Sequence, residues 1–207
     1  MKATRKSHRK LLYAFLIVFL LVLFTLVIIE KGKTSGKEIS TDMEVSVHQM
    51  DEETIVFLGN PEAENEMILL FDYVCPYCYQ WMEEVFPFIN EKWVESGKVM
   101  FRTQCLVLLS ETSLQLSKID QNLKDHYPEL YYEVFFANDD INEIDSWLED
   151  IKNLDHRLIE NEPRIDTLTL TRKYVRTYAL ESVPTVIVNG EDVDNPFDIN
   201  MMKQLFR

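Results

Sequence analysis

The pattern of apolar and polar residues divides the chain into one long apolar run and a much longer mixed region. Residues 11–29 form an unbroken run of nineteen uncharged residues, "LLYAFLIVFLLVLFTLVII". At the rise of an α-helix this run is about 28 Å long, which is close to the hydrocarbon thickness of a bilayer. The pattern therefore predicts one transmembrane helix at residues 11–29.

The mixed region begins without periodicity and then shows strand signals. Residues 30–42 are rich in Lys, Gly, Ser and Thr, which indicates a flexible tether. Residues 43–207 are long enough to fold as one domain with its own core. Short apolar runs that are typical of strands occur at residues 54–63, 67–73 and 98–109.

Between the second and third of these runs the periodicity changes. Apolar residues recur at intervals of three and four from Cys75 onwards, which predicts a helix. Pro87 is expected to kink this helix, and Gly97 lies where a C-terminal cap is expected. The order strand, strand, helix, strand indicates an α/β layer fold in which the helix crosses over between two strands.

A block of helical segments then interrupts the strand pattern. It occupies about residues 111–180, and its segments are separated at Pro128, Asn138–Asp139 and Pro163. This pattern predicts a helical subdomain that is inserted into the connections of the sheet.

Strand signals return after the helical block. They occur at residues 183–193, where Asn189 and Gly190 form the preferred pair for a tight hairpin turn. Residues 197–206 are amphipathic and are expected to form a last helix. The whole pattern predicts an α/β fold with a central mixed sheet and an inserted helical subdomain, preceded by one N-terminal transmembrane helix.

The charges around the apolar run predict its orientation. Residues 1–10 carry five basic residues and no acid, and the first acid of the chain is Glu30. A basic flank on one side favours a cytoplasmic N-terminus and an extracytoplasmic C-terminal domain. The alternative is a cleaved signal peptide and a secreted protein, although such a peptide usually has a shorter apolar region and a small-residue cleavage site. Both interpretations place residues 40–207 outside the cytoplasmic membrane.

Net charge excludes two classes of partner. The chain carries −14 at neutral pH, and its first ten residues hold five positive charges, which leaves −19 for the rest. A domain this acidic repels nucleic acid and anionic lipid headgroups. Neither is expected to bind it.

Candidate chemistry lies in Cys75 and Cys78, two of the three cysteines. A zinc site usually needs four nitrogen or sulfur ligands, and outside this pair the mixed region offers only scattered ones: Cys105, His48, His126 and His156. No metal is therefore expected. A purely structural disulfide is also disfavoured, because so short a loop removes little chain entropy.

A redox-active pair explains the neighbouring residues. Cys75 falls at a strand-to-helix junction, where unpaired N–H groups and the helix dipole favour a thiolate. Pro76 suits the first helical position. Cys78 is one turn further on, where it could resolve a mixed disulfide that forms at Cys75.

The sequence resembles the DsbA-like extracytoplasmic thiol–disulfide oxidoreductases of the thioredoxin superfamily, of the membrane-anchored, Gram-positive type. The resemblance rests on "FDYVCPYCYQWMEEVFPFINEKWVESGKVMFR" and "ESVPTVIVNG". It covers residues 54–109 and 172–193, whereas the helical middle is similar in length and character only. It implies a thioredoxin-like fold and no cofactor.

The resemblance also implies a role for each residue of the site. Cys75 would be the exposed nucleophile and Cys78 the buried resolving thiol. Pro76 and Tyr77 would be the dipeptide that tunes their potential. Pro184 would be a cis-proline that turns the backbone of Val183 toward the sulfurs, where it could pair with an extended substrate.

Two positions differ from the family pattern. Relatives often carry a buried acid six residues before the first cysteine, whereas this chain has Leu69 there. The nearest acids are Glu66 and Asp72, and Asp72 is interpreted only as the end of the strand. Strongly oxidising relatives carry a histidine between the cysteines, and Tyr77 cannot carry positive charge, so a milder oxidant is expected.

Other side chains near the pair are given structural roles. Cys105 is expected to be buried and inert. Trp81 is expected to face the core and Tyr79 to be half-exposed. Tyr77 alone is therefore predicted to contribute to an apolar rim for substrates.

The favoured function is a membrane-tethered oxidase that transfers the Cys75–Cys78 disulfide to exported proteins that contain cysteine. Reoxidation by a quinone-linked integral membrane partner is expected. One alternative reverses the electron flow and makes the protein a thiol reductase or isomerase. Another is a thioredoxin-fold holdase or assembly factor without catalysis.

Overall fold

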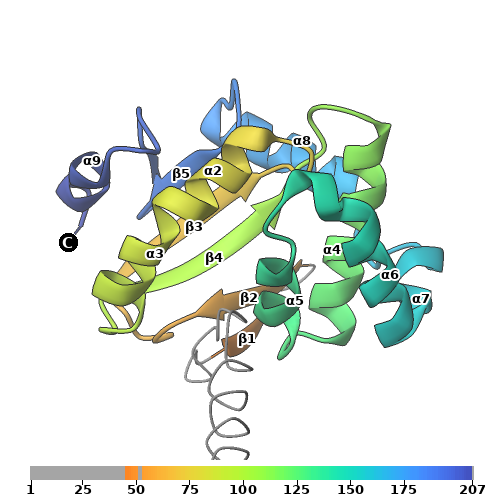
Figure 1. Ribbon diagram of the computed structural model, residues 1–207. Coiled ribbons are helices and arrows are strands. Elements are labelled where there is room, and N and C mark those ends of the chain that lie inside the picture. Colours follow the sequence, from red (N-terminus) through yellow and green to blue (C-terminus); the bar gives the residue numbers. More distant parts are fainter. Residues whose placement is uncertain (1–44, 51–52, 207) are drawn as a thin grey trace, which may run out of the picture. The chain divides into compact units, whose positions relative to one another are not determined.

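A computed structural model describes residues 45–50 and 53–206 (Figure 1). The basic flank at residues 1–10, the transmembrane helix predicted at 11–29 and the tether at 30–42 lie outside the described residues. Within the described residues, no helix combines the length and the apolar character that a bilayer-spanning segment needs.

A mixed sheet forms the centre of the domain, as the sequence predicts. Its six strands are arranged in the order β1-β2-β4-β3-β5-β6, where β3 and β4 are parallel and the other neighbouring pairs are antiparallel. The strands are β1 (Val45–Met50), β2 (Glu53–Leu58), β3 (Asn65–Phe71), β4 (Val99–Cys105), β5 (Thr185–Val188) and β6 (Glu191–Asp192). No sequence expectation covers β1, which pairs along its whole length with β2.

Side chains of β3 are buried on both faces of the sheet. Met67 and Leu69 belong to a hydrophobic cluster that includes Trp81, and Ile68 belongs to a second cluster that includes Leu170. Successive residues of a strand point to opposite faces, so the continuous apolar run supplies both clusters. The sequence prediction of a strand buried on both faces is confirmed.

The crossover from β3 to β4 is helical and is broken at the predicted proline. It consists of α2 (Pro76–Glu84), α3 (Phe86–Ile89) and a π-helical turn at Asn90–Val94. Pro87 lies in the first turn of α3, directly after the break. Gly97 has φ 73°, a left-handed conformation that ends the helical segment as expected.

The helical block predicted at 111–180 is confirmed. Its helices are α4 (Glu111–His126), α5 (Tyr131–Ala137), a 3₁₀ turn (Ile141–Glu143), α6 (Ile144–Asp155), α7 (Arg157–Glu160) and α8 (Thr167–Tyr178). The breaks fall at the predicted positions, because Pro128, Asn138 and Pro163 all lie between helices. In Figure 1, α4 to α7 lie beside the β2 and β4 side of the sheet, whereas α2 and α3 run along β3 and β4.

The chain returns to the sheet through residues 179–184. A turn at Asn189 (φ 52°) and Gly190 (φ 88°) joins β5 to β6, as predicted. The last helix is α9 (Ile199–Gln204). This return path brings the segment that precedes β5 next to the end of β3, where the cysteine pair lies.

Candidate active site

The active-site segment is the junction between β3 and α2. β3 ends at Phe71, and Cys75 is the N-cap residue of α2 with an extended backbone. The N–H group of Cys75 donates to the carbonyl oxygen of Asp72 at 3.0 Å, which closes the turn. Pro76 occupies the first helical position, where its missing N–H group is not needed. The predicted strand, CxxC and helix arrangement is therefore confirmed.

Cys75 is set up as an easily ionised thiol. Its pKa is lowered from 9.0 to about 6, mainly because the thiol of Cys78 donates a hydrogen bond to it. Burial opposes this effect, and the backbone N–H groups of Cys78 and Tyr77 at the start of α2 contribute to it. At neutral pH the reduced protein therefore carries a thiolate at Cys75.

Cys78 has the opposite character. Burial raises the pKa of its thiol far above 9.0, and the hydrogen bond to Cys75 raises it further. Its side chain is 3% exposed and belongs to the core beneath α2. The two thiols therefore differ in the way that an attacking and a resolving thiol must differ. The sequence analysis expects Cys75 to be the attacking thiol and Cys78 the resolving thiol.

The expectation that Cys75 is exposed is wrong. Its side chain is only 4% exposed. The physical reason is tertiary: the chain returns at Val183, whose carbonyl oxygen lies 3.5 Å from the sulfur of Cys75 and accepts a hydrogen bond from it when the thiol is protonated. The Val183–Pro184 peptide bond is cis, as predicted, and the backbone of Val183 faces the sulfur.

The aromatic residues around the pair differ in exposure. Tyr77 is 63% exposed, as predicted, and Pro76 beside it is exposed as well. Tyr79 is half-buried, and its hydroxyl accepts a hydrogen bond from Asn138 at 2.8 Å. Trp81 is fully buried, and its indole N–H donates to the carbonyl oxygen of Pro196 at 2.6 Å. Of these, only Tyr77 presents an aromatic surface beside Cys75.

Asp72 has more contacts than the sequence interpretation allowed. It follows the last residue of β3, as expected, but its side chain is 0% exposed. The carboxylate accepts the N–H groups of Val74 at 3.0 Å, Leu108 at 3.1 Å and Leu109 at 3.3 Å. The interpretation of Asp72 only as the end of the strand is therefore wrong, because its carboxylate also joins the active-site turn to the segment after β4. Leu69, which replaces the usual acid, is fully buried.

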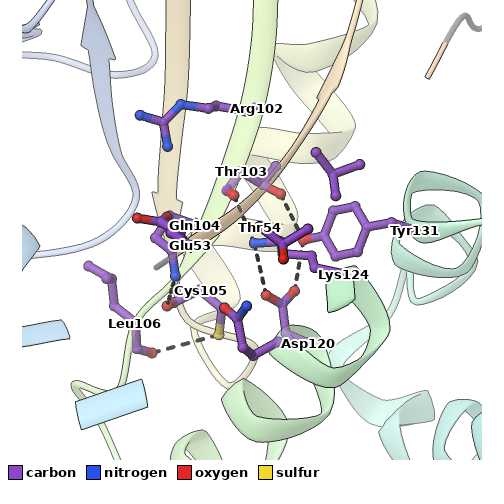
Figure 2. Close-up of polar contacts among 12 residues, drawn as sticks. Glu53, Thr54, Arg102, Thr103, Gln104, Cys105, Leu106, Asp120, Lys124 and Tyr131 are labelled. Carbon is purple, nitrogen blue, oxygen red and sulfur yellow. Dashed lines mark hydrogen bonds and ion pairs between the residues drawn. The ribbon is translucent and has the colours of Figure 1, made fainter. Parts of the chain in front are cut away.

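A buried ionic network lies behind the active site (Figure 2). Lys124 and Asp120 are 2% and 1% exposed, and their charged atoms are 3.0 Å apart. Asp120 also accepts the hydroxyl groups of Tyr73 and Tyr131, at 2.9 and 2.7 Å. Lys124 donates to the carbonyl oxygen of Thr103 at 3.0 Å. Sequence reasoning missed this network, because its members come from three separate elements, α4, α5 and β4, and from the turn after β3.

Cys105 lies at the end of β4, beside this network (Figure 2). The prediction that it is buried is confirmed, since its side chain is 3% exposed. Burial raises the pKa of its thiol well above 9.0, and the nearby carboxylate of Asp120 raises it further. Within residues 53–206 no group of three His, Cys, Asp or Glu side chains converges to hold a metal ion.

Comparison with known proteins gives one family. A family model described as thioredoxin matches residues 51–206. No curated protein matches the chain significantly.

Solved structures share the fold at low sequence identity. The chain is similar to MdbA, a thiol-disulfide oxidoreductase from Corynebacterium diphtheriae, with 14% identity, TM-score 0.60, and coverage of 83% of this chain and 100% of that one. It is similar to oxidised BdbD from Bacillus subtilis, with 14% identity, TM-score 0.57, and coverage of 79% and 96%. A protein-disulfide isomerase from Novosphingobium aromaticivorans gives 15% identity, TM-score 0.56, and coverage of 72% and 93%.

Proposed function

Because the chain belongs to the thioredoxin family, we propose that it is a DsbA-type thiol–disulfide oxidoreductase whose working group is the Cys75–Cys78 pair. The observation that carries this proposal is the contrast between the two thiols. Cys75 has a pKa lowered to about 6 by the Cys78 thiol, and burial raises the pKa of Cys78 far above its usual value. The names of the similar structures, among them a thiol-disulfide oxidoreductase and a protein-disulfide isomerase, support the same chemistry.

The exchange proceeds in two steps. A client thiolate attacks the sulfur of Cys75, the Cys75–Cys78 bond breaks, and Cys78 leaves and takes up a proton. A second client thiolate then attacks the client sulfur of this mixed disulfide and expels Cys75 as a thiolate. Two electrons pass from the client to the pair, and one disulfide forms in the client. The low pKa of Cys75 favours the second step, because a more acidic thiol is a better leaving group.

Val183 would align the client. Its carbonyl oxygen lies 3.5 Å from the sulfur of Cys75, so an extended client segment that pairs with the backbone at Val183 would bring its own sulfur to Cys75. Tyr77, which is 63% exposed, adds an apolar surface beside this position. In the dithiol form Cys75 is 4% exposed, so a client disulfide that exchanges with it must displace the contact between its sulfur and Val183.

The direction of electron flow is proposed as oxidation of exported proteins. A thiolate that is stabilised at Cys75 stabilises the reduced pair, and a pair that is stable when reduced gives its disulfide away readily. Reoxidation would come from a quinone-linked integral membrane partner. The membrane helix at residues 11–29, with the N-terminus in the cytoplasm and the domain outside, would hold the protein near that partner.

A trapping experiment tests the function. Cys78→Ser leaves the Cys75 thiolate able to attack a client disulfide, which forms a mixed disulfide and frees the second client sulfur as a thiolate, and Cys78 is no longer there to release the bound client. We expect this variant to accumulate covalent complexes with exported proteins, which reducing agents release and mass spectrometry identifies. Cys105→Ser is the matched control, because it removes the third thiol and should leave exchange unchanged.

The outcomes separate the competing functions. If the protein is a catalyst, Cys75→Ser abolishes its effect on exported proteins. If it is a holdase, Cys75→Ser keeps that effect. If Cys78→Ser forms no complexes while Cys75→Ser remains active in the cell, the oxidoreductase proposal is wrong. A Cys75–Cys78 couple that is strongly reducing against glutathione would instead reverse the direction to that of a reductase.

A further inference from the structure

Asp72 is a fully buried carboxylate that the two exchange steps do not use. It lies three residues before Cys75, at the end of β3, and its side chain is 0% exposed. Burial of a carboxylate is costly unless its oxygens are hydrogen-bonded. In residues 53–206 its side-chain partners are the N–H groups of Val74, Leu108 and Leu109, at 3.0 to 3.3 Å, and not the side chain of a lysine, arginine or histidine.

These three bonds join two segments that are distant in sequence. Val74 immediately precedes Cys75, whereas Leu108 and Leu109 lie between β4 and α4. The carbonyl oxygen of Asp72 also accepts the N–H group of Cys75 at 3.0 Å. Side chain and backbone of this one residue therefore fix the turn that presents Cys75 at the start of α2.

The negative charge of Asp72 also disfavours ionisation of both thiols, as a smaller effect than burial and the hydrogen bond between the two thiols. For Cys75 it opposes the hydrogen bond from Cys78, which is the main cause of the lowered pKa. For Cys78 it adds to burial, which is the main cause of the raised pKa. A nearby negative charge disfavours the ionised form of a thiol, so both effects have the sign that electrostatics requires.

We propose that Asp72 is a positioning residue that sets the reduction potential of the Cys75–Cys78 couple, an inference that rests on the proposed function. Asp72 holds a negative charge against the active-site turn. The disulfide is therefore less oxidising than the start of α2 alone would make it. Only the reduced pair carries a thiolate, so the repulsion from Asp72 raises the free energy of the reduced form and leaves that of the disulfide unchanged.

The equilibrium with glutathione measures this effect directly. The protein disulfide takes two electrons from two glutathione thiols, which become glutathione disulfide. The pair is left as the Cys75 thiolate and the Cys78 thiol, so one of the two glutathione protons stays on Cys78 and the other passes to solvent. Any group that destabilises the Cys75 thiolate shifts this equilibrium toward the disulfide.

Asp72→Asn is the main test, because the amide has nearly the same shape and no charge. Its one oxygen still accepts either from Val74 or from Leu108 and Leu109, whereas its NH2 group cannot accept from an N–H group. We expect the equilibrium of this variant with glutathione at pH 7 to shift toward the dithiol by about threefold, less than the factor of ten that one whole pKa unit gives, because the charge of Asp72 is a smaller effect on Cys75 than the bond from Cys78. The pH at which iodoacetamide alkylation of Cys75 reaches half of its maximal rate should fall in parallel. Glu53→Gln is the matched control: it neutralises another buried carboxylate, which contacts Tyr174 and Lys173 instead, and should change neither value.

The sign of the shift separates a redox role from a structural one. If Asp72 only shapes the turn, its replacement loosens the start of α2, and Cys75 becomes less acidic and the disulfide more stable. A shift in that direction, or no shift in folded Asp72→Asn, overturns the proposal. Circular dichroism checks that the variant is folded, and Asp72→Ser replaces it if it is not; failure of both to fold makes Asp72 a structural residue and also overturns the proposal.

The wild-type protein keeps this test separate from the proposed function. If wild-type Cys75 and Cys78 do not equilibrate with glutathione at all, the oxidoreductase proposal fails and the role of Asp72 fails with it. If the wild type equilibrates and Asp72→Asn has the same equilibrium constant, only the inference about Asp72 is wrong.

Discussion

Cys75 lies at the first N–H groups of α2, and Cys78 lies one turn further on, inside the core beneath the helix. The same helix therefore stabilises a thiolate at its start and buries a neutral thiol one turn later. The hydrogen bond between the two thiols increases the difference, because it lowers the pKa of Cys75 and raises that of Cys78. Two intervening residues are enough to give the two thiols different pKa values, because the surroundings change from the helix end to the core over one turn.

The pKa of Cys75 predicts how stability depends on pH. In the reduced folded protein this pKa is about 6, and the ordinary value is 9.0, so folding favours the thiolate mainly through the bond from Cys78. The stabilisation is complete above the unfolded value and is lost as pH falls through about 6. Between pH 5.5 and 7.5 the free energy of unfolding of the reduced protein should rise by about 2 kcal/mol relative to the oxidised protein.

Denaturant unfolding of both forms across this range measures the difference. The oxidised protein is the control, since it lacks both thiols and shares every other titrating group, including Cys105. Above about pH 9 the trend should reverse, because Cys78 then ionises in the unfolded chain while burial keeps its folded pKa far higher. A constant difference from pH 5.5 to 7.5 would contradict the assigned ionisation of Cys75.

At the scale of elements, α4 is attached to the sheet through charged groups as well as apolar ones. Lys124 and Asp120 are one turn apart on α4, and Lys124 reaches the backbone of Thr103 in β4. Asp120 also binds Tyr73, which directly follows Asp72 in the turn after β3. The network thus connects the helical insertion both to the sheet and to the active-site turn.

Removal of either charge of this network should lower the stability of the protein, and the loss should be larger for Asp120 than for Lys124. Asp120→Asn leaves Lys124 as a buried cation without its anion, which is expected to cost about 3–5 kcal/mol of stability. Lys124→Met leaves Asp120 with two hydroxyl donors, Tyr73 and Tyr131, so the loss should be smaller. Urea unfolding of both variants and of the double variant gives the individual losses and the coupling energy. Equal losses in the two single variants would show that the tyrosines do not support Asp120.

At the scale of the whole molecule, the active site depends on how the described domain closes on itself. The chain leaves the sheet after β4, forms five helices, and returns at Val183–Pro184 beside Cys75. The site is therefore assembled from the two ends of a long insertion. The described residues, 45–50 and 53–206, belong to one compact unit, and β1 is an edge strand of its sheet.

Two shortened chains test the contribution of that edge strand. A chain that begins at residue 43 keeps all six strands, whereas a chain that begins at Glu53 lacks β1 and leaves β2 without its antiparallel partner. We expect both to fold, and the shorter one to be less stable by about 2 kcal/mol, because several backbone hydrogen bonds are lost. Urea unfolding of the two chains is the measurement. Equal stability would mean that β1 adds nothing to the domain.

Much of the fold is predictable from local patterns. The apolar run of β3, the periodic α2 that Pro87 interrupts, and the Asn189–Gly190 turn are each determined by neighbouring residues, and all three are confirmed. The position of Cys75 at a helix start follows from the same local rules, and its lowered pKa follows largely from that position and from Cys78.

The sequence by itself thus determined the order of the elements and the identity of the reactive pair, because propensity, periodicity and helix ends act over a few residues. Only the tertiary structure decided that Cys75 is buried beneath Val183, which the resemblance had placed near the sulfurs, that Asp72 holds the segment after β4, and that Asp120 pairs with Lys124 against Tyr73. Those contacts join residues that are far apart in sequence. Burial and charge at such places depend on which elements pack together, and no local pattern specifies that.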